Sequence, residues 1–394
     1  MSQASPSAFS TSAVIWVNRY LPREAIAEQA KQLADSGAVD HLLLFDQMLS
    51  WWPQSLWTPK NAPIAAMSPD YESFPDPFTL GGYVAAKAPG LGIMVSTDAV
   101  RWGPAELMRS MLTLSDLTEG RATLMLGAGE VKQCKPFGWK RSQGLARFED
   151  HLRLFHEIWN ASGPFDFQGN HWAFEQGWLG AARRYRPEIW GLGGGPKLFD
   201  LATSFADGIG TVTPGVWSTP EQTAAGVAAI KEQLRGKGRD PEGFGFCPFQ
   251  MIVMHSDPAV IDRALDNPLI KFAAAVWGRL HMPEWRAEGY EPPFPDDWHY
   301  AIRLLPAKMS AADIDDVLGK VTREMVEKAF IVGTPDHVAA ELQRHIDAGV
   351  TRILPINMLP SILDLEQIPG ATQANIDMCK HLKDRAAVPA GAAG

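Results

Sequence analysis

The chain has 394 residues, of which 46% are hydrophobic and 21% are charged, a composition typical of globular proteins and not of disordered or fibrous chains. Its 36 Lys and Arg against 45 Asp and Glu leave a net charge of −9. That balance argues against a nucleic-acid-binding protein that depends on phosphate contacts. Tryptophan is unusually frequent, at 14 residues against 6 tyrosines, which points either to a deep apolar site or interface or to core packing.

The sequence shows no signal for export or membrane insertion. Residues 1–7 have neither a basic region nor an apolar run, and no stretch of 18 consecutive apolar residues occurs. Cys134, Cys247 and Cys379 lie far apart and fit neither a disulfide framework nor a zinc motif. We therefore expect a cytoplasmic protein in which these cysteines are small, buried or neutral residues.

Short apolar runs alternate with helical stretches along the chain. The eight runs span residues 13–17, 42–45, 91–96, 122–126, 188–192, 209–212, 249–254 and 352–357. Most are apolar on both faces, as are parallel strands that helices cover on each side. The alternation predicts a (β/α)8 TIM barrel rather than a doubly wound sheet, and residues 1–394 as one domain rather than two or three.

Helix ends are marked by proline at the start and glycine at the end. This asymmetry predicts one helix between Pro22 and Gly37 and another between Pro335 and Gly349, with Thr334 as its N-cap. A further helix has one apolar face, made of Leu145, Phe148, Leu152, Phe155 and Trp159.

Two stretches interrupt the alternation. Residues 50–77, rich in Pro and Trp, follow the second strand, and residues 267–320, punctuated by six prolines, follow the seventh. Long loops in compact domains are usually functional, and both would lie over the carboxyl face of the barrel, where such folds place active sites. The Ala- and Gly-rich tail, residues 386–394, is expected to fray.

Two glycine-rich segments each follow a strand. Residues 126–130 read Leu-Gly-Ala-Gly-Glu, and residues 192–196 read Leu-Gly-Gly-Gly-Pro before a helix. Neither matches the dinucleotide or P-loop spacing. The second segment either leaves backbone N–H groups open to a phosphate or forms a tight strand-to-helix turn.

Two acidic residues end strand candidates and should lie at the same barrel mouth. A carboxyl group among apolar walls can hold a proton near neutral pH and act as a general acid. For Asp46 a cap or a structural ion pair is an equal alternative, whereas a functional role is favoured for Glu130, which follows Gly129.

Other chemistry has less support. The ten histidines form no metal-binding pattern, and no G-x-S-x-G elbow of a hydrolase occurs. Trp51, Trp52 and Trp57 in the first long loop either pack that loop onto the barrel or wall a flat ligand by stacking.

Together these segments resemble the bacterial luciferase-like superfamily of flavin- and deazaflavin-dependent oxidoreductases, over nearly the whole chain. The segments that resemble its coenzyme F420 branch are residues 46–51 (DQMLSW), 94–97 (MVST), 101–104 (RWGP), 126–130 (LGAGE) and 193–196 (GGGP). Trp51 and residues 56–59 (LWTP) and 127–131 (GAGEV) are similar to the phthiodiolone ketoreductase group.

The resemblance implies coenzyme F420 as the cofactor, with FMN as the alternative, and a homodimer. Met94 and Val95 match a bulge in the third strand, usually with a non-prolyl cis peptide bond, that backs the central ring of the cofactor. The residues that the resemblance places around the cofactor, the last four at the phosphate cradle, are Asp46, Met94, Val95, Ser96, Thr97, Gly129, Gln133, Gly193, Gly194, Gly195 and Pro196.

The resemblance also implies catalytic residues. Glu130 matches the active-site acid, and Trp51 matches an indole beside the hydride-accepting carbon. The F420-dependent sugar-phosphate dehydrogenases carry a His where this chain has Gln47, which cannot take a proton from a hydroxyl group. Residues 211–217 also lack the Lys, and Ala329 replaces the Arg, that hold the sugar phosphate there. An apolar carbonyl substrate is therefore favoured over a sugar phosphate.

The sequence thus predicts a reductase that uses reduced F420 to deliver hydride to a carbonyl or an activated double bond. Glu130 would donate the proton or polarise the acceptor, Gln47 would hydrogen-bond the developing oxyanion, and Trp51 would exclude water. The alternatives are an FMN-dependent monooxygenase of the same superfamily and a non-catalytic flavin-binding protein. No metal and no nucleic-acid partner are expected.

Overall fold

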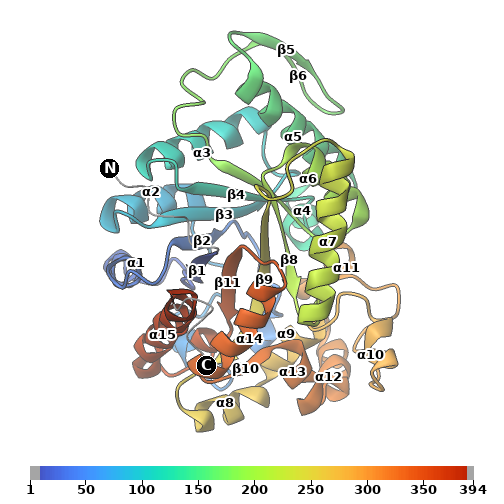
Figure 1. Cartoon of the computed structure of the whole chain (residues 1–394). Helices are drawn as coiled ribbons and strands as arrows, with labels where there is room; N and C mark the ends of the chain where they lie inside the picture. Colours follow the sequence, from blue (N-terminus) through green and yellow to red (C-terminus); the bar gives the residue numbers. More distant parts are fainter. Residues whose placement is uncertain (1–8, 388–394) are drawn as a thin grey trace, which may run out of the picture.

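Eight parallel strands close into a barrel in the computed structural model, which describes residues 9–387. Each predicted run overlaps one barrel strand, and pairing of β8 with β9 and of β1 with β11 closes the ring. The strands are β1 (Ser10–Val14), β2 (His41–Phe45), β3 (Gly92–Asp98), β4 (Ala122–Gly127), β7 (Glu188–Leu192), β8 (Gly208–Thr213), β9 (Gly245–Met254) and β11 (Arg352–Asn357). The predicted (β/α)8 barrel is confirmed (Figure 1).

Helices surround the barrel on its outer face (Figure 1). They are α1 (Arg23–Asp35), α2 (Pro77–Lys87), α3 (Pro104–Leu117), α5 (Gly144–Asn160), α6 (Pro196–Phe205), α7 (Pro220–Gly236), α8 (Pro258–Leu265), α14 (Pro335–Asp347) and α15 (Ile368–Ala387). The helix ends at α1 and α14 agree with the predicted signals, and Thr334 is the N-cap residue of α14, although its side chain makes no capping hydrogen bond.

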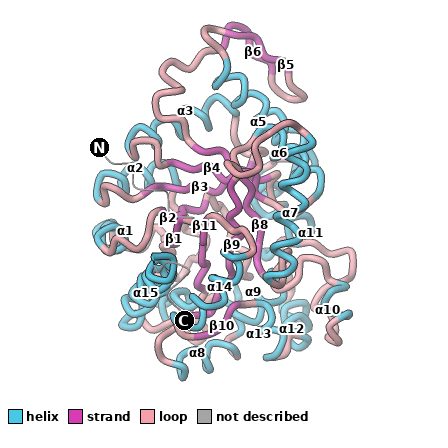
Figure 2. The backbone as a smooth tube through the Cα atoms, in the orientation of Figure 1, coloured by secondary structure: helices cyan, strands magenta, loops and turns pink. Residues whose placement is uncertain are grey.

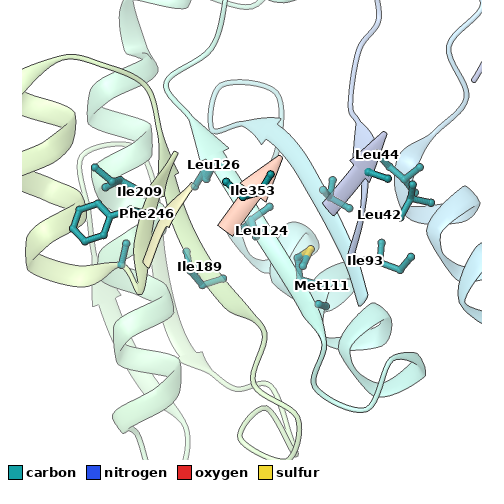
Figure 3. Packing of buried hydrophobic residues seen from close by; sticks show 14 of the residues in the cluster. Leu42, Leu44, Ile93, Met111, Leu124, Leu126, Ile189, Ile209, Phe246 and Ile353 are labelled. Carbon is teal, nitrogen blue, oxygen red and sulfur yellow. The ribbon is translucent and has the colours of Figure 1, made fainter. Parts of the chain in front are cut away.

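Alternate residues of each strand pack in opposite directions, as the pleat requires. In β2, Leu42 and Leu44 belong to the hydrophobic layer between strands and helices, together with Leu124 of β4 (Figure 3), whereas Leu43 and Met94 belong to the cluster that includes the barrel interior. Both faces of the strands are therefore buried, which explains why they appear in the sequence as continuous apolar runs.

A polar cluster fills the amino end of the barrel. The Arg352 guanidinium lies 2.9 Å from the Glu188 carboxylate, donates to Thr123 Oγ1 at 2.9 Å and covers the Trp190 ring at 4.7 Å. Because this end is closed by side chains, the open mouth is at the carboxyl ends of the strands.

The two predicted insertions pack against each other at that mouth. The first, after β2, holds two short 3-10 helices, Gln54–Leu56 and Pro63–Ala66. The second, which follows β9 and α8, forms α9 (Pro268–Trp277), α10 (Pro283–Ala287), α11 (Tyr300–Arg303) and α12 (Ala311–Lys320), and continues as α13 (Arg323–Ala329). The Trp52 indole donates to the Leu269 carbonyl at 2.9 Å, and the Asn267 amide donates to the Asn61 carbonyl at 2.7 Å.

Three strands lie outside the predicted eight. The hairpin β5 (Phe165–Gln168) and β6 (Ala173–Gly177) lies apart from the barrel, beyond α5 (Figure 2). Strand β10 (Ile331–Gly333) pairs with the last residues of β9. The short helix α4 (Val131–Cys134) follows β4 directly and positions part of the site.

Three further observations bear on the expectations from sequence. All three cysteines are buried and free, as predicted. Among the described residues, no helix is both long and apolar enough to cross a bilayer. Helix α15 continues to Ala387, and the rest of the tail that was expected to fray lies outside the described residues.

Candidate active site

A cavity of about 660 Å³ opens at the carboxyl ends of the barrel strands and is partly covered by the second insertion. The predicted site residues that line it are Asp46, Gln47, Trp51, Ser96, Thr97, Gly129, Glu130, Gln133, Gly193, Gly194, Gly195 and Pro196. Of the predicted catalytic and cofactor-binding residues, only Met94 and Val95 are not among its lining residues.

Asp46 is the centre of a buried network. Its carboxylate accepts hydrogen bonds from Thr97 Oγ1 at 2.5 Å and from the Trp102 indole at 2.7 Å, and it forms an ion pair of 3.1 Å with Arg101. Arg101 also pairs with Asp98 at 2.5 Å. The structural ion pair, one of the two alternatives for Asp46, is therefore the one that the fold forms. Burial raises the pKa of Asp98 above its usual value despite this cation.

Glu130 has a cationic partner that the sequence reading did not anticipate. Lys132 Nζ lies 2.8 Å from Glu130 Oε2 and donates to the Leu49 carbonyl at 3.1 Å. Glu130 is 27% exposed and faces the cavity, whereas the side chain of Lys132 is 1% exposed. The prediction that Glu130 is an acid assumed that its surroundings are apolar. The structure instead places a cation beside it.

The turn into α4 requires glycine at position 129. Its φ is +89°, in the left-handed region, and a Cβ there would come within 3.0 Å of Val100 and 3.3 Å of Cys134. This turn lets the chain leave β4 so that Glu130 reaches the cavity.

Gln133 holds the loop after β2. Its Oε1 accepts from the backbone N–H groups of Met48 and Leu49 at 2.8 and 3.1 Å, and its Nε2 donates to the Leu49 carbonyl at 2.9 Å. Gln133 borders the cavity and its amide is bonded to this backbone, so it positions the loop, while its contact with a cofactor stays a prediction.

The tryptophans of the first insertion divide between the two alternatives. Trp51 lines the cavity, and its buried indole N–H has no hydrogen-bond partner among the described residues. Trp52 and Trp57 are buried behind it and donate to the carbonyls of Leu269 and Ser68. One ring is thus available to a ligand, while the other two pack the loop onto the barrel. Trp217, by contrast, belongs to the outer hydrophobic layer and not to the cavity.

The second insertion supplies a further part of the cavity wall. Tyr300 packs against Trp277 with ring centroids 4.2 Å apart and planes tilted by 52°, and it stacks on His299 at 5.0 Å. All three residues line the cavity. Burial raises the pKa of the Tyr300 hydroxyl well above its usual range, so this phenol stays protonated, and burial lowers the pKa of His299. Helix α11, which begins at Tyr300, packs against α4, which follows Glu130.

The glycine segment after β7 leads into α6. Gly193 N–H is bonded to the Gly210 carbonyl at 2.9 Å, and α6 has no side-chain cap at its amino end. A Cβ at Gly194 would lie 3.1 Å from Val216, but one at Gly195 would meet nothing within 4 Å. The segment therefore combines a tight turn with open space at an uncapped helix start, which suits an anionic group.

Several buried polar atoms around the cavity have no hydrogen-bond partner within residues 9–387. They are Gln47 Oε1, Trp51 Nε1, Arg141 Nε, Thr211 Oγ1 and Trp277 Nε1. Because an unpaired buried polar group costs about 1–3 kcal/mol, their gathering in one cavity points to a polar ligand. No group of three or more His, Cys, Asp or Glu within residues 9–387 is arranged to hold a metal ion.

The expected cis peptide bond in the third strand is not found. Strand β3 pairs with β2 and β4 in continuous register, and the cis peptide within the described part of the chain is Thr213–Pro214. Met94 and Val95 are both fully buried, Met94 in the cluster that includes the barrel interior and Val95 against the outer helices. Because neither side chain lines the cavity, their contact with a cofactor stays a prediction, whereas Ser96 and Thr97 at the strand end do line it.

Sequence reasoning missed Lys132, Arg141, His299 and Tyr300. Lys132 stands two residues after Glu130, a spacing that could have suggested a partner for the acid. The other three carry no signal in the sequence, because only tertiary folding brings them into the cavity lining with Glu130. His299 and Tyr300 arrive there with the second insertion.

A comparison of the sequence with models of protein families identifies the family of this chain. A model described as luciferase-like monooxygenase matches residues 26–352. The chain belongs to the luciferase-like monooxygenase family. This confirms the resemblance that the sequence motifs indicated.

Curated relatives cover most of the chain. A phthiodiolone/phenolphthiodiolone dimycocerosates ketoreductase of Mycobacterium kansasii is 28% identical over 347 residues, 84% of this chain and 90% of the relative. An F420-dependent glucose-6-phosphate dehydrogenase of Kineococcus radiotolerans is 26% identical over 283 residues, 69% and 74% of the two chains.

Solved structures share the fold at low identity. An F420-dependent secondary alcohol dehydrogenase in complex with an F420–acetone adduct has a TM-score of 0.70 at 16% identity and covers 93% of this chain and 98% of its own. A long-chain alkane monooxygenase has a TM-score of 0.65 at 15% identity, with coverage of 96% and 91%. These similarities establish the common barrel.

Proposed function

We propose that this protein is an F420-dependent oxidoreductase that transfers hydride between the deazaflavin and the carbonyl group of an apolar substrate. The observation that carries the proposal is the meeting of Glu130, Gln47, Trp51 and an uncapped helix start in one cavity. The curated relatives support it, since they are named as ketoreductases and as an F420-dependent dehydrogenase.

The residues present fit a cofactor of this kind. Gly194, Gly195 and the start of α6 would hold its phosphate, because this helix start is uncapped and a Cβ at Gly195 would meet only open space. The unpaired atoms Thr211 Oγ1 and Trp51 Nε1 would hydrogen-bond its polar edges. When bound, reduced F420 supplies the hydride.

The protein's own residues would then manage the proton and the charge. In the reductive direction the Glu130 carboxyl group gives its proton to the oxygen that was the carbonyl, and in the reverse direction the carboxylate takes it back. The Gln47 amide donates a hydrogen bond to the same oxygen as charge develops there. Tyr300, whose raised pKa keeps its hydroxyl group protonated, is a second donor that lines the cavity.

The residues that line the cavity favour an apolar substrate. Away from the glycine segment its wall is largely aromatic and aliphatic, formed by Phe249, Met251, Trp277, Leu280 and Ile356. Burying such surface against an apolar substrate also excludes water from the reacting groups.

A fluorescence titration followed by a turnover assay tests the proposal. We expect quenching by F420 at micromolar concentration, weaker binding of FMN, and oxidation of reduced F420 by aliphatic or aryl ketones. Tight binding of FMN alone with oxygen-dependent product formation would instead establish a monooxygenase, the alternative that the alkane monooxygenase neighbour favours. Binding of F420 without turnover of any carbonyl compound would indicate a non-catalytic binding protein.

The organisation as one domain and the homodimer stay predictions. A cooperative single unfolding transition would support one domain, and light scattering coupled to size exclusion would measure the number of subunits. A cytoplasmic location likewise awaits fractionation of the cells that make the protein.

A further inference from the structure

We propose that Lys132 is a positioning residue of the active site, which holds Glu130 and the loop that carries Trp51 in one fixed arrangement. Lys132 is among the largest fully buried side chains of the described residues. Burying an ammonium group is costly unless it is paired and hydrogen-bonded. Its partners are therefore the reason for its place in the fold.

These partners connect two walls of the cavity. Lys132 Nζ contacts the Glu130 carboxylate at 2.8 Å and the Leu49 carbonyl at 3.1 Å, and it lies 5.9 Å from the centroid of the Trp51 ring. The neighbouring Gln133 binds the same loop backbone. Residues 132 and 133 thus fasten the segment after β2 to the segment after β4.

A second carboxylate faces the same loop. Glu72 accepts a hydrogen bond from Ser50 N–H at 2.6 Å, and burial raises its pKa above the usual value, an effect that the charge of Lys132 opposes. Lys132 is the ion-pair partner of Glu130, not of Glu72, among the contacts of the described residues. Its direct effect should therefore reach the reaction through Glu130.

The chemical consequence rests on the proposed function. When the Glu130 carboxyl group gives its proton to the substrate oxygen, a carboxylate remains, and the ammonium group 2.8 Å away stabilises that negative charge. Lys132 therefore aids proton transfer without touching substrate or cofactor.

The test compares Lys132→Met and Lys132→Arg in the full-length protein, with Lys135→Met as the matched control. Lys135 is an exposed lysine three residues further on and does not line the cavity. Hydrogen exchange of the peptide covering residues 47–57 is measured without any cofactor, and kcat and the Kd for F420 are measured with it.

We expect Lys132→Met to exchange faster at residues 48–52 and to lower kcat by about tenfold or more while the Kd for F420 changes by less than about threefold. Lys132→Arg should recover part of the protection from exchange and part of kcat, and Lys135→Met should match the wild type in both. If Lys132 acts through Glu130, adding Lys132→Met to Glu130→Gln should cause no further loss of kcat.

Other results would overturn the proposal. If the exchange rate and kcat of Lys132→Met stay within twofold of the wild type, the contact between Lys132 and Glu130 has no role. If Lys132→Met lowers kcat equally in the wild type and in Glu130→Gln, Lys132 does not act through Glu130. If Lys132→Met fails to fold, the variant Glu130→Gln/Lys132→Met, which leaves no unpaired buried charge, should fold, and it provides the exchange measurement. Absence of F420 turnover in the wild type would refute the proposed function. The hydrogen-exchange result would still test whether Lys132 fastens the loop after β2 to the segment after β4.

Discussion

The indole of Trp51 meets the indole of Trp277 edge to face, with ring centroids 6.0 Å apart and planes at 89°. One ring comes from the insertion after β2 and the other from the end of α9, so the two insertions join at the cavity wall. Both indole N–H groups are buried and have no hydrogen-bond partner in the part of the chain that the structure describes. A ligand that satisfies them would therefore be held by both insertions at once.

Trp51 and Trp52 should respond differently to the same substitution. Trp52→Phe loses the hydrogen bond to the Leu269 carbonyl and should lower the free energy of unfolding by about 1–3 kcal/mol. Trp51→Phe loses no hydrogen bond in the protein, so it should cost less than about 1 kcal/mol but reduce kcat/KM by about tenfold. Urea unfolding and steady-state kinetics measure the two effects, and similar profiles for both variants would contradict the division made here.

Replacing Glu130 by Gln removes the proton that we propose it transfers but keeps its size. We expect kcat to fall by about a hundredfold or more, the usual range for loss of a general acid. The Kd for F420, from fluorescence titration, should change by less than about threefold. Equal losses in kcat and in affinity would refute a role specific to proton transfer.

Gly195 offers a test of the phosphate cradle. A methyl group at Gly195 meets no protein atom, so Gly195→Ala should fold with an unchanged melting temperature yet weaken F420 binding by about tenfold, or 1.4 kcal/mol. Gly163, which likewise has open space around its Cβ position and does not line the cavity, provides the control as Gly163→Ala. If Gly195→Ala binds F420 with unchanged affinity, the phosphate does not bind at this helix start.

Arg101 should matter more for stability than an exposed arginine. Arg101→Met leaves the buried carboxylates of Asp46 and Asp98 without their cation and should cost about 3–5 kcal/mol in urea unfolding. Arg186→Met breaks a partly exposed ion pair with Asp207 and should cost less than about 1 kcal/mol. A loss below 1 kcal/mol for Arg101→Met would mean that the network is not needed for folding.

His151 predicts a loss of stability on acidification. Burial lowers its pKa to about 4, and its Nδ1 donates to the Arg147 carbonyl, which leaves the buried Nε2 without hydrogen or partner. Since the unfolded state takes up a proton near pH 6.5, stability is lost as the pH falls from about 6.5 towards 4. Between pH 7 and pH 5 the free energy of unfolding should fall by about 2 kcal/mol less in His151→Asn than in the wild type. An identical loss in urea unfolding would contradict this.

Much of the fold could be read from the sequence because its signals are local. Strands buried on both faces must be apolar throughout, so runs such as residues 42–45 stood out, and proline and glycine marked the helix ends. The hairpin β5–β6 was missed because its residues are mostly exposed and short of apolar character. The cavity lining was predicted where residues follow strands directly, as Asp46 and Glu130 do.

What the sequence by itself determined was the barrel, the two insertions and the strand-end residues that share its mouth. Only the tertiary structure decided what surrounds them: that Asp46 is held by Arg101, that Glu130 is paired with a buried Lys132, and that one of three neighbouring tryptophans faces the cavity. The physical reason is that burial and ion pairing depend on which distant segments meet, and spacing along the chain does not encode those meetings.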